Sequence, residues 1–352
     1  MLSSFKIKSL YGNYKVNFIN SFKSSIKKNN NINAFYLIDQ KIYNLHKKFF
    51  KKNINKNLIL LKANENTKSI EESINIIKKL LIKNIQKDSE IIIIGGGVLQ
   101  DVGAFASSLL FRGINYSFYP TTLLSQCDSC IGSKTSININ NYKNLIGNFW
   151  SPKNIYIDTS FLKSLSNQEI KSGIGEMIHY FIYDNSFLFN KIIKNYNQVF
   201  HNRSLLKEYI LGSLKIKKSV IEIDEFDLNE RRKFNYGHTF GHALETLTNY
   251  KISHGQAVTI GMDLSNFISF HYGFIDAKDY YYNNNLLKLN MPKIKLNTYD
   301  INLYIKALRK DKKNKNKKLG CILLNKNKKL QLTYISFNLK LFKNIQTYFN
   351  NF

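Results

Sequence analysis

The chain has few cysteines, few prolines and no long apolar run. Its 352 residues include three cysteines, too few for the disulfide framework of a small secreted protein. The first residues lack the apolar core of a signal peptide, and no apolar run approaches the ~20 residues of a membrane-spanning helix. The sequence therefore predicts a cytoplasmic protein without a membrane partner.

Two of the cysteines, Cys127 and Cys130, form a CxxC pair that lacks supporting residues. A zinc site would need a second CxxC or nearby histidines, and a redox site would need a thioredoxin-like setting at a helix N-terminus. Neither accompanies the pair, so we interpret both cysteines as small packing residues.

Acidic residues are also scarce, with 24 Asp and Glu against 52 Lys and Arg and a net charge of +28. Such a balance is typical of nucleic-acid-binding proteins. The basic residues are mostly lysines spread along the chain among abundant Asn, Ile, Tyr and Phe, however, and no arginine-rich arm, zinc-finger spacing or RNP-type strand is present. Solvated lysine surfaces explain the charge better, and we expect no nucleic-acid partner.

The first half of the chain alternates apolar runs with helical patterns. The apolar runs that predict strands are 33–39, 57–63, 90–97 and 115–120. The segments that predict helices are 41–51, 68–85 and 99–110, the second with an apolar stripe of Ile70, Ile74, Ile77, Leu81 and Ile85. Continuous apolar strands alternating with helices predict an α/β domain with a mainly parallel, Rossmann-like sheet covered on both faces.

From about residue 160 the pattern becomes helical. The predicted helices are 165–182, 186–196, 203–222, 236–248 and 255–272, and all three prolines lie outside them. A Lys/Asn-rich end, 312–329, predicts a loop and a short hairpin around its CILL. We place a domain boundary near 155–160, with a mostly α-helical second domain.

Three of the seven histidines, His238, His242 and His254, fall within one short window. His238 and His242 are one helical turn apart and so share a face of a helix. Glu176 adds a carboxylate, and with His238 and His254 it makes an open, catalytic type of divalent-metal set. The alternative is a helix with surface histidines, but the third histidine and the adjacent glycines favour a functional site.

Two glycine-rich segments also suggest ligand binding, but less specifically than the set of histidines and Glu176 does. Gly95–Gly97 follows a predicted strand and precedes a helix, where backbone N–H groups can approach a phosphate, although a tight turn would look the same. The segment 120–149 combines Lys134, Lys143 and Asn144 with Gly, Ser and Thr. Such residues grip phosphate or hydroxyl groups, although a surface loop would look similar.

Together these segments resemble the 3-dehydroquinate synthase family, within the wider sugar-phosphate cyclases. The resemblance runs from about residue 33 to about 330 and rests on GGGVLQDVGAF, FRGI, PTTLLSQCDS, GSKTSIN, KNLIGNF, NYGHTFGHALE, HGQAV and DKK. It implies an NAD-binding α/β domain over 1–157, a mostly helical metal- and substrate-binding domain over 158–352, and an active site in the cleft between them.

The resemblance also implies a role for individual residues. Glu176, His238 and His254 match the ligands of one divalent metal, usually zinc, with cobalt as the alternative, and His242 matches a catalytic histidine rather than a ligand. Lys217 and Arg231 match a pair that holds the substrate carboxylate, and Asp128 matches a contact to substrate hydroxyls. The residues that match phosphate contacts are Lys134, Asn144, Asn235 and one of Lys312 and Lys313. Arg112 matches an arginine that reaches the phosphate of the neighbouring subunit, which implies a homodimer.

For NAD+ the implied contacts span the first domain. They are Asp39, Glu65, Lys68, Gly96, Gly97, Val98, Asp101, Thr121, Thr122, Asp128, Lys134 and Lys143.

The family's chemistry makes sense of this set. NAD+ oxidises a secondary alcohol held on the metal, phosphate leaves by elimination, NADH returns its hydride, and the ring closes in an aldol-type step. The substrate implied is the seven-carbon sugar-acid phosphate DAHP (3-deoxy-D-arabino-heptulosonate 7-phosphate), in the second step of the shikimate pathway. His242 suits proton transfer near neutral pH.

Three residues depart from the family pattern. His179 stands where a lysine is usual, Asp227 where a glutamate implicated in proton transfer is usual, and Ser133 where a second glycine is usual. His179 either replaces a contact to a substrate hydroxyl or approaches the metal as an extra ligand, and we favour the contact.

These departures keep a second function open, a related cyclase acting on another heptulose or hexose phosphate. Such a substrate without a carboxylate has no need of Lys217 and Arg231, and the presence of both favours the synthase. A basic nucleic-acid-binding protein would need no metal triad. A metal-dependent polyol dehydrogenase would release NADH, whereas a cyclase shows no net NADH.

Overall fold

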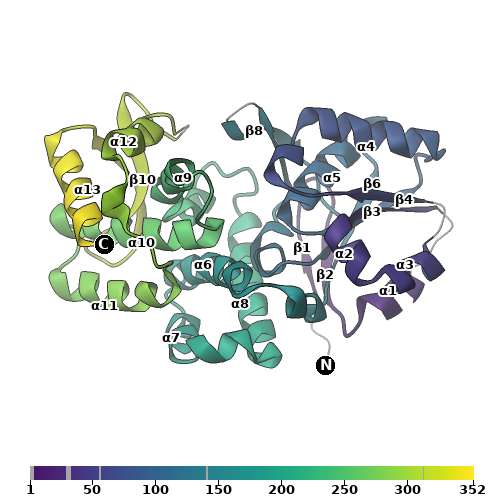
Figure 1. Cartoon of the computed structure of the whole chain (residues 1–352), viewed down its shortest axis with the longest axis horizontal. Coiled ribbons are helices and arrows are strands. Elements are labelled where there is room, and N and C mark those ends of the chain that lie inside the picture. Colours follow the sequence, from purple (N-terminus) through teal and green to yellow (C-terminus); the bar gives the residue numbers. More distant parts are fainter. Residues whose placement is uncertain (1–3, 29–32, 55–56, 140–141, 312) are drawn as a thin grey trace. The chain divides into compact units, whose positions relative to one another are not determined.

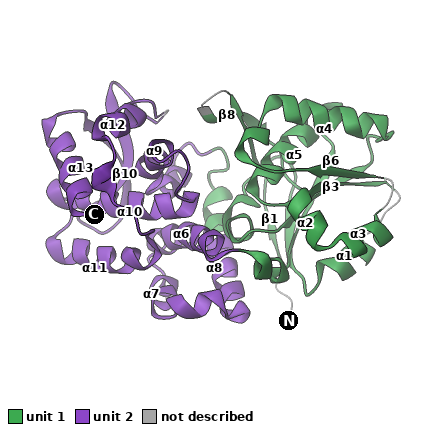
Figure 2. Ribbon diagram, in the orientation of Figure 1, with its two compact units in different colours: residues 1–165, 217–226 green, residues 166–216, 227–352 purple. Residues whose placement is uncertain are grey.

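The computed structural model describes residues 4–28, 33–54, 57–139, 142–311 and 313–352 (Figure 1). The chain divides into two compact units (Figure 2). The first comprises residues 1–165 and 217–226, and the second comprises 166–216 and 227–352.

The first unit contains a seven-stranded sheet in the order β1-β2-β9-β6-β5-β3-β4. Its strands are β1 (Ser4–Ile7), β2 (Tyr14–Phe18), β3 (Ala34–Asp39), β4 (Leu58–Leu61), β5 (Glu90–Gly95), β6 (Asn115–Pro120) and β9 (Asn154–Ile157). Every neighbouring pair is parallel except β1 and β2. The interior strand β5 is apolar and buried along Ile91–Ile94 because both faces are covered. The predicted parallel sheet is confirmed.

The helices of the first unit follow its strands, as expected for a doubly wound sheet. They are α1 (Phe22–Lys28), α2 (Gln40–Leu45), α3 (Lys47–Asn53), α4 (Ile70–Ile82) and α5 (Gly97–Leu109). The predicted helix 41–51 is in fact two helices that meet at His46.

The predicted apolar stripe of α4 is wrong. The helix buries Ser73, Ile76 and Leu80, whereas Ile74 is 43% exposed and Leu81 is 48% exposed. Isoleucines and leucines occupy more than one face of this helix, so periodicity alone does not choose the buried row. The small residue Ser73 lies on the buried face of α4, and its hydroxyl donates to the Ser69 carbonyl.

A second sheet of the first unit lies in the polar segment 120–149, for which the sequence predicted ligand contacts or a surface loop but no strand. Strands β7 (Lys134–Ile139) and β8 (Tyr142–Phe149) form an antiparallel hairpin, and β7 packs against α5. Thr135 and Ile137 alternate inward from β7, the period of a strand with one covered face.

The second unit is mostly helical, as predicted. Its helices are α6 (Asn167–Tyr183), α7 (Phe187–Lys194), α8 (Arg203–Ile221), α9 (His238–Leu247), α10 (His254–His271), α11 (Ala277–Leu287), α12 (Ile301–Arg309) and α13 (Leu339–Asn351). The last five residues of α8, 217–221, belong to the first unit. All five predicted helices are present, and the sequence reading missed α11, α12 and α13. The hairpin β10 (Lys318–Leu324) and β11 (Leu330–Ser336) is longer than predicted.

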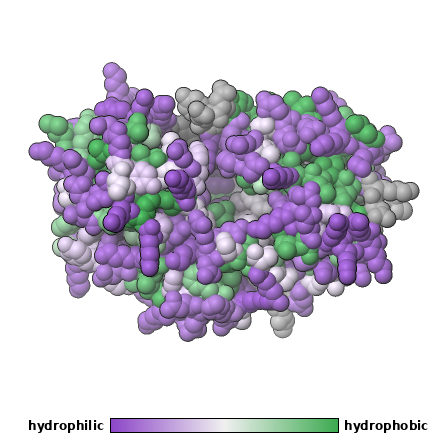
Figure 3. Space-filling view, in the orientation of Figure 1, coloured by the Kyte–Doolittle hydropathy of each residue, from purple (hydrophilic) through white to green (hydrophobic). Residues whose placement is uncertain are grey.

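Helix α10 is the centre of the second unit. Every residue from Gly255 to Ser269 is buried, and the helix packs against α6, α9, α11 and α13. Among the described residues, no helix is both long enough and apolar enough to span a membrane. On the face shown in Figure 3, hydrophilic side chains predominate.

Candidate metal centre and cofactor-site residues

Helices α6, α9 and α10 approach one another closely at glycines. A Cβ atom added to Gly175 of α6 would lie 2.0 Å from the carbonyl oxygen of Gly255 on α10. One added to Gly261 of α10 would lie 2.0 Å from the carbonyl oxygen of Gly237, which precedes α9 with a φ of +79°. Only glycine permits such backbone contacts. The three helices therefore bring their histidines and glutamate into one small volume.

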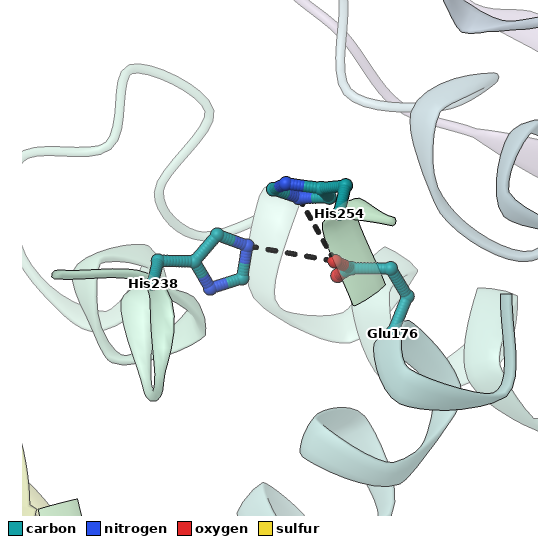
Figure 4. A group of neighbouring side chains, drawn as sticks. All are labelled: Glu176, His238 and His254. Carbon is teal, nitrogen blue, oxygen red and sulfur yellow. Dashed lines mark ion pairs between the residues drawn. The ribbon is translucent and has the colours of Figure 1, made fainter. Parts of the chain in front are cut away.

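Glu176 of α6, His238 of α9 and His254 of α10 meet there (Figure 4). Oε1 of Glu176 lies 3.1 Å from Nε2 of His254 and 3.7 Å from Nε2 of His238. One ligand atom from each of the three residues lies within 4.8 Å of the others. Ligand atoms around a tetrahedral zinc ion are about 3.3 Å apart, given bonds of about 2.0 Å. The donor set and its spacing therefore fit one divalent metal ion.

The other ring nitrogens of both histidines also have partners. Nδ1 of His238 lies 3.2 Å from the carbonyl oxygen of Tyr236, and Nδ1 of His254 lies 3.1 Å from Oε2 of Glu245. Such outer partners orient imidazoles that bind metals. Sequence reasoning missed Tyr236 and Glu245. The spacing of Glu245, three residues after His242 on the same helix, was the available signal.

The pKa shifts of the three residues differ in direction. Burial acts to raise the pKa of Glu176, but His238, His179 and His254 outweigh it and hold this pKa well below 4.5. Burial lowers the pKa of His238 to about 4, so its imidazole is neutral at neutral pH. For His254 burial is opposed by the carboxylates of Glu245 and Glu176, which raise its pKa well above 6.5. Glu176 and His238 are therefore in the forms that coordinate a metal, whereas His254 must release a proton to do so.

The two remaining histidines of the site differ in their surroundings. The His242 ring lies 5.6 Å from that of His254, centroid to centroid. His179 is 1% exposed, and its Nδ1 lies 3.2 Å from Oε2 of Glu176, the oxygen opposite the one that faces His238 and His254. His179 therefore lies beside the carboxylate of the candidate metal group.

Other predicted residues of the second unit lie on nearby segments. Arg231, which is buried, and Asn235 belong to the 3-10 turn Glu230–Asn235, which Tyr236 and Gly237 connect to α9. Asp227 has a φ of +62°, and its carbonyl accepts from Arg232. Lys313 pairs with Asp311 at 2.9 Å and helps to lower the pKa of His238. Lys312 lies outside the described residues.

In the first unit, several predicted NAD+ residues lie at the carboxyl ends of adjacent parallel strands. Asp39 ends β3, Gly96 follows β5, and Thr121 and Thr122 follow β6. Gly96 is the N-cap of α5 without a side-chain cap, and Gly97 and Val98 form its first turn. This edge of a parallel sheet and an open helix N-terminus suit a dinucleotide phosphate. Asp39 caps α2 by accepting from the Lys41 and Ile42 amides.

A second group of predicted residues forms a polar network around Lys68. Its ammonium lies 2.5 Å from Asp101 of α5 and 2.6 Å from the Asn144 amide oxygen of β8. Lys143 lies 3.8 Å from Glu65. Burial raises the pKa of Asp101 in spite of its lysine partner. The β7–β8 hairpin thus brings Asn144 to the predicted nucleotide contacts.

Asp128 and Lys217 form an ion pair of 2.8 Å. Asp128 lies in the π-helical turn Ser125–Ser129, and Lys217 comes from the part of α8 in the first unit. The same turn contains Cys127, and Cys130 follows it. Neither cysteine is in a disulfide, both are buried, and burial raises the pKa of Cys130 to about 12, as expected of packing residues.

Three more predicted positions lie on β7 and the α5–β6 connection. Lys134 begins β7 and is exposed, and Ser133 before it has a φ of +60°. Arg112 is exposed on the turn Leu110–Arg112 with a φ of +63°.

Comparisons with known proteins agree with the geometry. The family model 3-dehydroquinate synthase N-terminal matches residues 58–172, and 3-dehydroquinate synthase C-terminal matches 173–314. The 3-dehydroquinate synthase of Clostridium tetani is 39% identical over 81% of this chain and 78% of its own length. That of Buchnera aphidicola subsp. Cinara cedri is 36% identical over 92% and 89%. A 2-deoxy-scyllo-inosose synthase structure, complexed with carbaglucose-6-phosphate, NAD+ and Co2+, shares the fold, with a TM-score of 0.87 and 22% identity over 99% and 100% of the two chains. Because both family models match in order and these relatives are similar over most of their length, the chain belongs to the 3-dehydroquinate synthase family.

Proposed function

We propose that the protein is a 3-dehydroquinate synthase, a lyase that converts DAHP to 3-dehydroquinate and phosphate. The observation that carries this proposal is the convergence of Glu176, His238 and His254, in a chain of this family, at distances that fit one divalent ion. We expect NAD+ and Zn2+ or Co2+ as cofactors. When bound, they supply transient oxidation of an alcohol and Lewis-acid stabilisation of its oxygen.

The chain's own residues bind the substrate and move its protons. Lys217 and Arg231 are buried cations, and we assign them to the substrate carboxylate. His242, beside the His254 ring, is the acid–base group. The proposed phosphate contacts are Lys134, Asn144, Asn235 and Lys313. In the absence of substrate Lys217 is held by Asp128, which keeps its charge compensated.

We propose that NAD+ binds at the carboxyl edge of β3, β5 and β6. The uncapped start of α5 at Gly96, Gly97 and Val98 supports a pyrophosphate there, since the first N–H groups of a helix favour anions. Asp39 at the end of β3, and Glu65 and Lys68 near α4, are assigned to the rest of the dinucleotide. The structural relative with bound NAD+ supports this assignment.

The protein is further proposed to act in the cytoplasm as a homodimer in which Arg112 reaches the neighbouring active site. The surface around Arg112 supports an interface. Leu109 and Phe111 beside it are 45% and 36% exposed. Exposed apolar side chains next to a cation are typical of a contact surface.

Phosphate release from DAHP with NAD+ and Zn2+ tests the function directly. We expect phosphate and 3-dehydroquinate in equal amounts, loss of turnover on chelation, and no net NADH. A carboxylate-free heptulose 7-phosphate is the matched substrate. If it is converted faster than DAHP, the enzyme is the alternative cyclase, and accumulation of NADH would indicate a dehydrogenase.

The variant Arg231→Ala sharpens this test. A charge-assisted contact worth roughly 1.5–3 kcal/mol predicts that kcat/KM for DAHP falls by about one to two orders of magnitude. Any conversion of the carboxylate-free substrate should change far less. Equal losses on both substrates would contradict the carboxylate role.

A further inference from the structure

Glu245 lies on the face of α9 that carries the site histidines. His238, His242 and Glu245 follow one another at steps of four and three residues, so they form one row along the helix. The His254 ring of α10 lies against this row, with its centroid 5.5 Å from that of His238 and 5.6 Å from that of His242. Glu245 is 4% exposed, so its carboxylate is buried beside His254.

The two nitrogens of the His254 ring face two different carboxylates. Nε2 lies 3.1 Å from Oε1 of Glu176, and Nδ1 lies 3.1 Å from Oε2 of Glu245. A neutral imidazole carries one proton, and a nitrogen that coordinates a metal must be free of it. If Nδ1–H donates to Glu245, the lone pair of Nε2 points toward Glu176.

We propose that Glu245 is a positioning residue of the metal site, which holds His254 in the tautomer and orientation that present Nε2 to the ion. The inference rests on the proposed function, because the ion is part of that proposal. A carboxylate acceptor also makes the imidazole a more basic ligand.

The comparison with His238 explains why a side chain is needed at this position. Tyr236 precedes His238 by two residues, and its backbone carbonyl accepts from Nδ1. His254 begins α10, and its Nδ1 is met by the side chain of another helix. The orientation of His254 therefore depends on one replaceable residue.

The test compares E245A and E245Q with wild type and with D263N as control. Asp263 is a second buried carboxylate, on the same helix as His254, and it accepts from Asn284 and Tyr348 instead of from a site histidine. Zn2+ affinity is measured by competition with a chelator. We expect E245A to weaken it by about 10–100-fold. E245Q should lose less Zn2+ affinity than E245A, since its amide oxygen still accepts from Nδ1–H. D263N should bind Zn2+ with wild-type affinity.

A second readout does not depend on E245A folding. In zinc-loaded wild type the Nδ1 proton of His254 should resonate downfield because it is shared with a carboxylate, and in E245Q it should move upfield. An unmoved resonance, or wild-type Zn2+ affinity in folded E245A, overturns the inference while leaving the proposed function intact. Two Zn2+ ions per chain, one of them lost in E245A, would make Glu245 a ligand with His242 and also overturn it. Wild type that binds no Zn2+ would instead refute the proposed function.

Discussion

At the scale of single residues, equal side-chain types acquire different roles from their neighbours. His238 and His254 have opposite pKa shifts, one lowered by burial and the other raised by Glu245 and Glu176 against burial. His242 shares the face of α9 with His238 but does not belong to the group with Glu176. The helix position therefore brings the imidazoles together. Among the described residues only His238 and His254 lie within reach of the Glu176 carboxylate in a candidate metal group, which is why we propose His242 as the acid–base group.

This division predicts different losses in two alanine variants. His238→Ala should lose both the bound ion and turnover, because it removes one of three ligands. His242→Ala should keep about one ion per chain and lose turnover by roughly 10²–10⁴-fold, the usual contribution of general acid–base catalysis. Metal content by elemental analysis and phosphate release from DAHP check this. If both variants lose the ion equally, the assigned roles are wrong.

A buried carboxylate outside the site predicts a pH dependence of stability. Burial raises the pKa of Asp263 above 3.8, and its partners are the Asn284 amide, 3.0 Å away, and the Tyr348 hydroxyl, 2.8 Å away. A raised folded-state pKa means that this group stabilises the protein below pH 3.8 and that the contribution is lost as pH rises through the folded pKa. Asp263→Asn cannot ionise. Its unfolding temperature relative to wild type should therefore increase as pH rises from about 4. Parallel pH profiles for the two proteins would contradict this.

At the scale of elements, glycines decide how closely the helices of the metal centre pack. Helix α6 approaches α10 closely where Gly175 meets Gly255. The start of α9 approaches α10 closely where Gly237 meets Gly261. Glycine normally weakens a helix interior, by roughly 0.5–1 kcal/mol relative to alanine. Here the close approach that it permits brings the candidate metal ligands from three helices together.

Gly261→Ala should therefore disturb both stability and metal binding. Its Cβ atom would lie 2.0 Å from a backbone oxygen, which cannot rotate away. We expect a loss of about 1–3 kcal/mol in unfolding free energy and weaker Zn2+ binding, because α10 must move from His238. Gly212→Ala on α8 is the control. Its Cβ atom would meet the end of the Leu188 side chain, which can change rotamer. Equal Zn2+ affinities in the two variants would refute the glycine argument.

At the scale of the whole molecule, the proposed dimer makes each active site depend on both chains. Arg112 is exposed at the end of the short turn Leu110–Arg112, directly after exposed Phe111 and close in sequence to exposed Leu109. A cation that serves the neighbouring subunit would lie in such a place. Closed two-fold symmetry would then repeat the contact in both directions.

Mixing two inactive variants tests this dependence. Arg112→Ala and His242→Ala should each be almost inactive as homodimers. Co-expression should restore about a quarter of wild-type turnover, since half of the dimers are mixed and each contains one complete site. Activity is measured on the co-expressed mixture after a dimer mass is established by light scattering. No recovery from a confirmed mixed dimer would place Arg112 in its own subunit's site or outside the site.

Local sequence patterns predicted four strands of the parallel sheet, five helices of the second unit and the residue types of the candidate metal site. Apolar runs marked the central parallel strands, and the spacing of His238 and His242 placed both imidazoles on one helix face, because these signals are local and periodic. Tertiary structure decided the rest. In the folded chain, α4 faces the core with Ile76 and Leu80, and β7 pairs with β8. The carboxylates of Glu176 and Glu245 lie beside different ring nitrogens of His254. These outcomes depend on contacts between residues far apart in the chain. The local spacing of residues in the sequence does not specify such contacts. The close packing of the folded chain determines which of the possible contacts form.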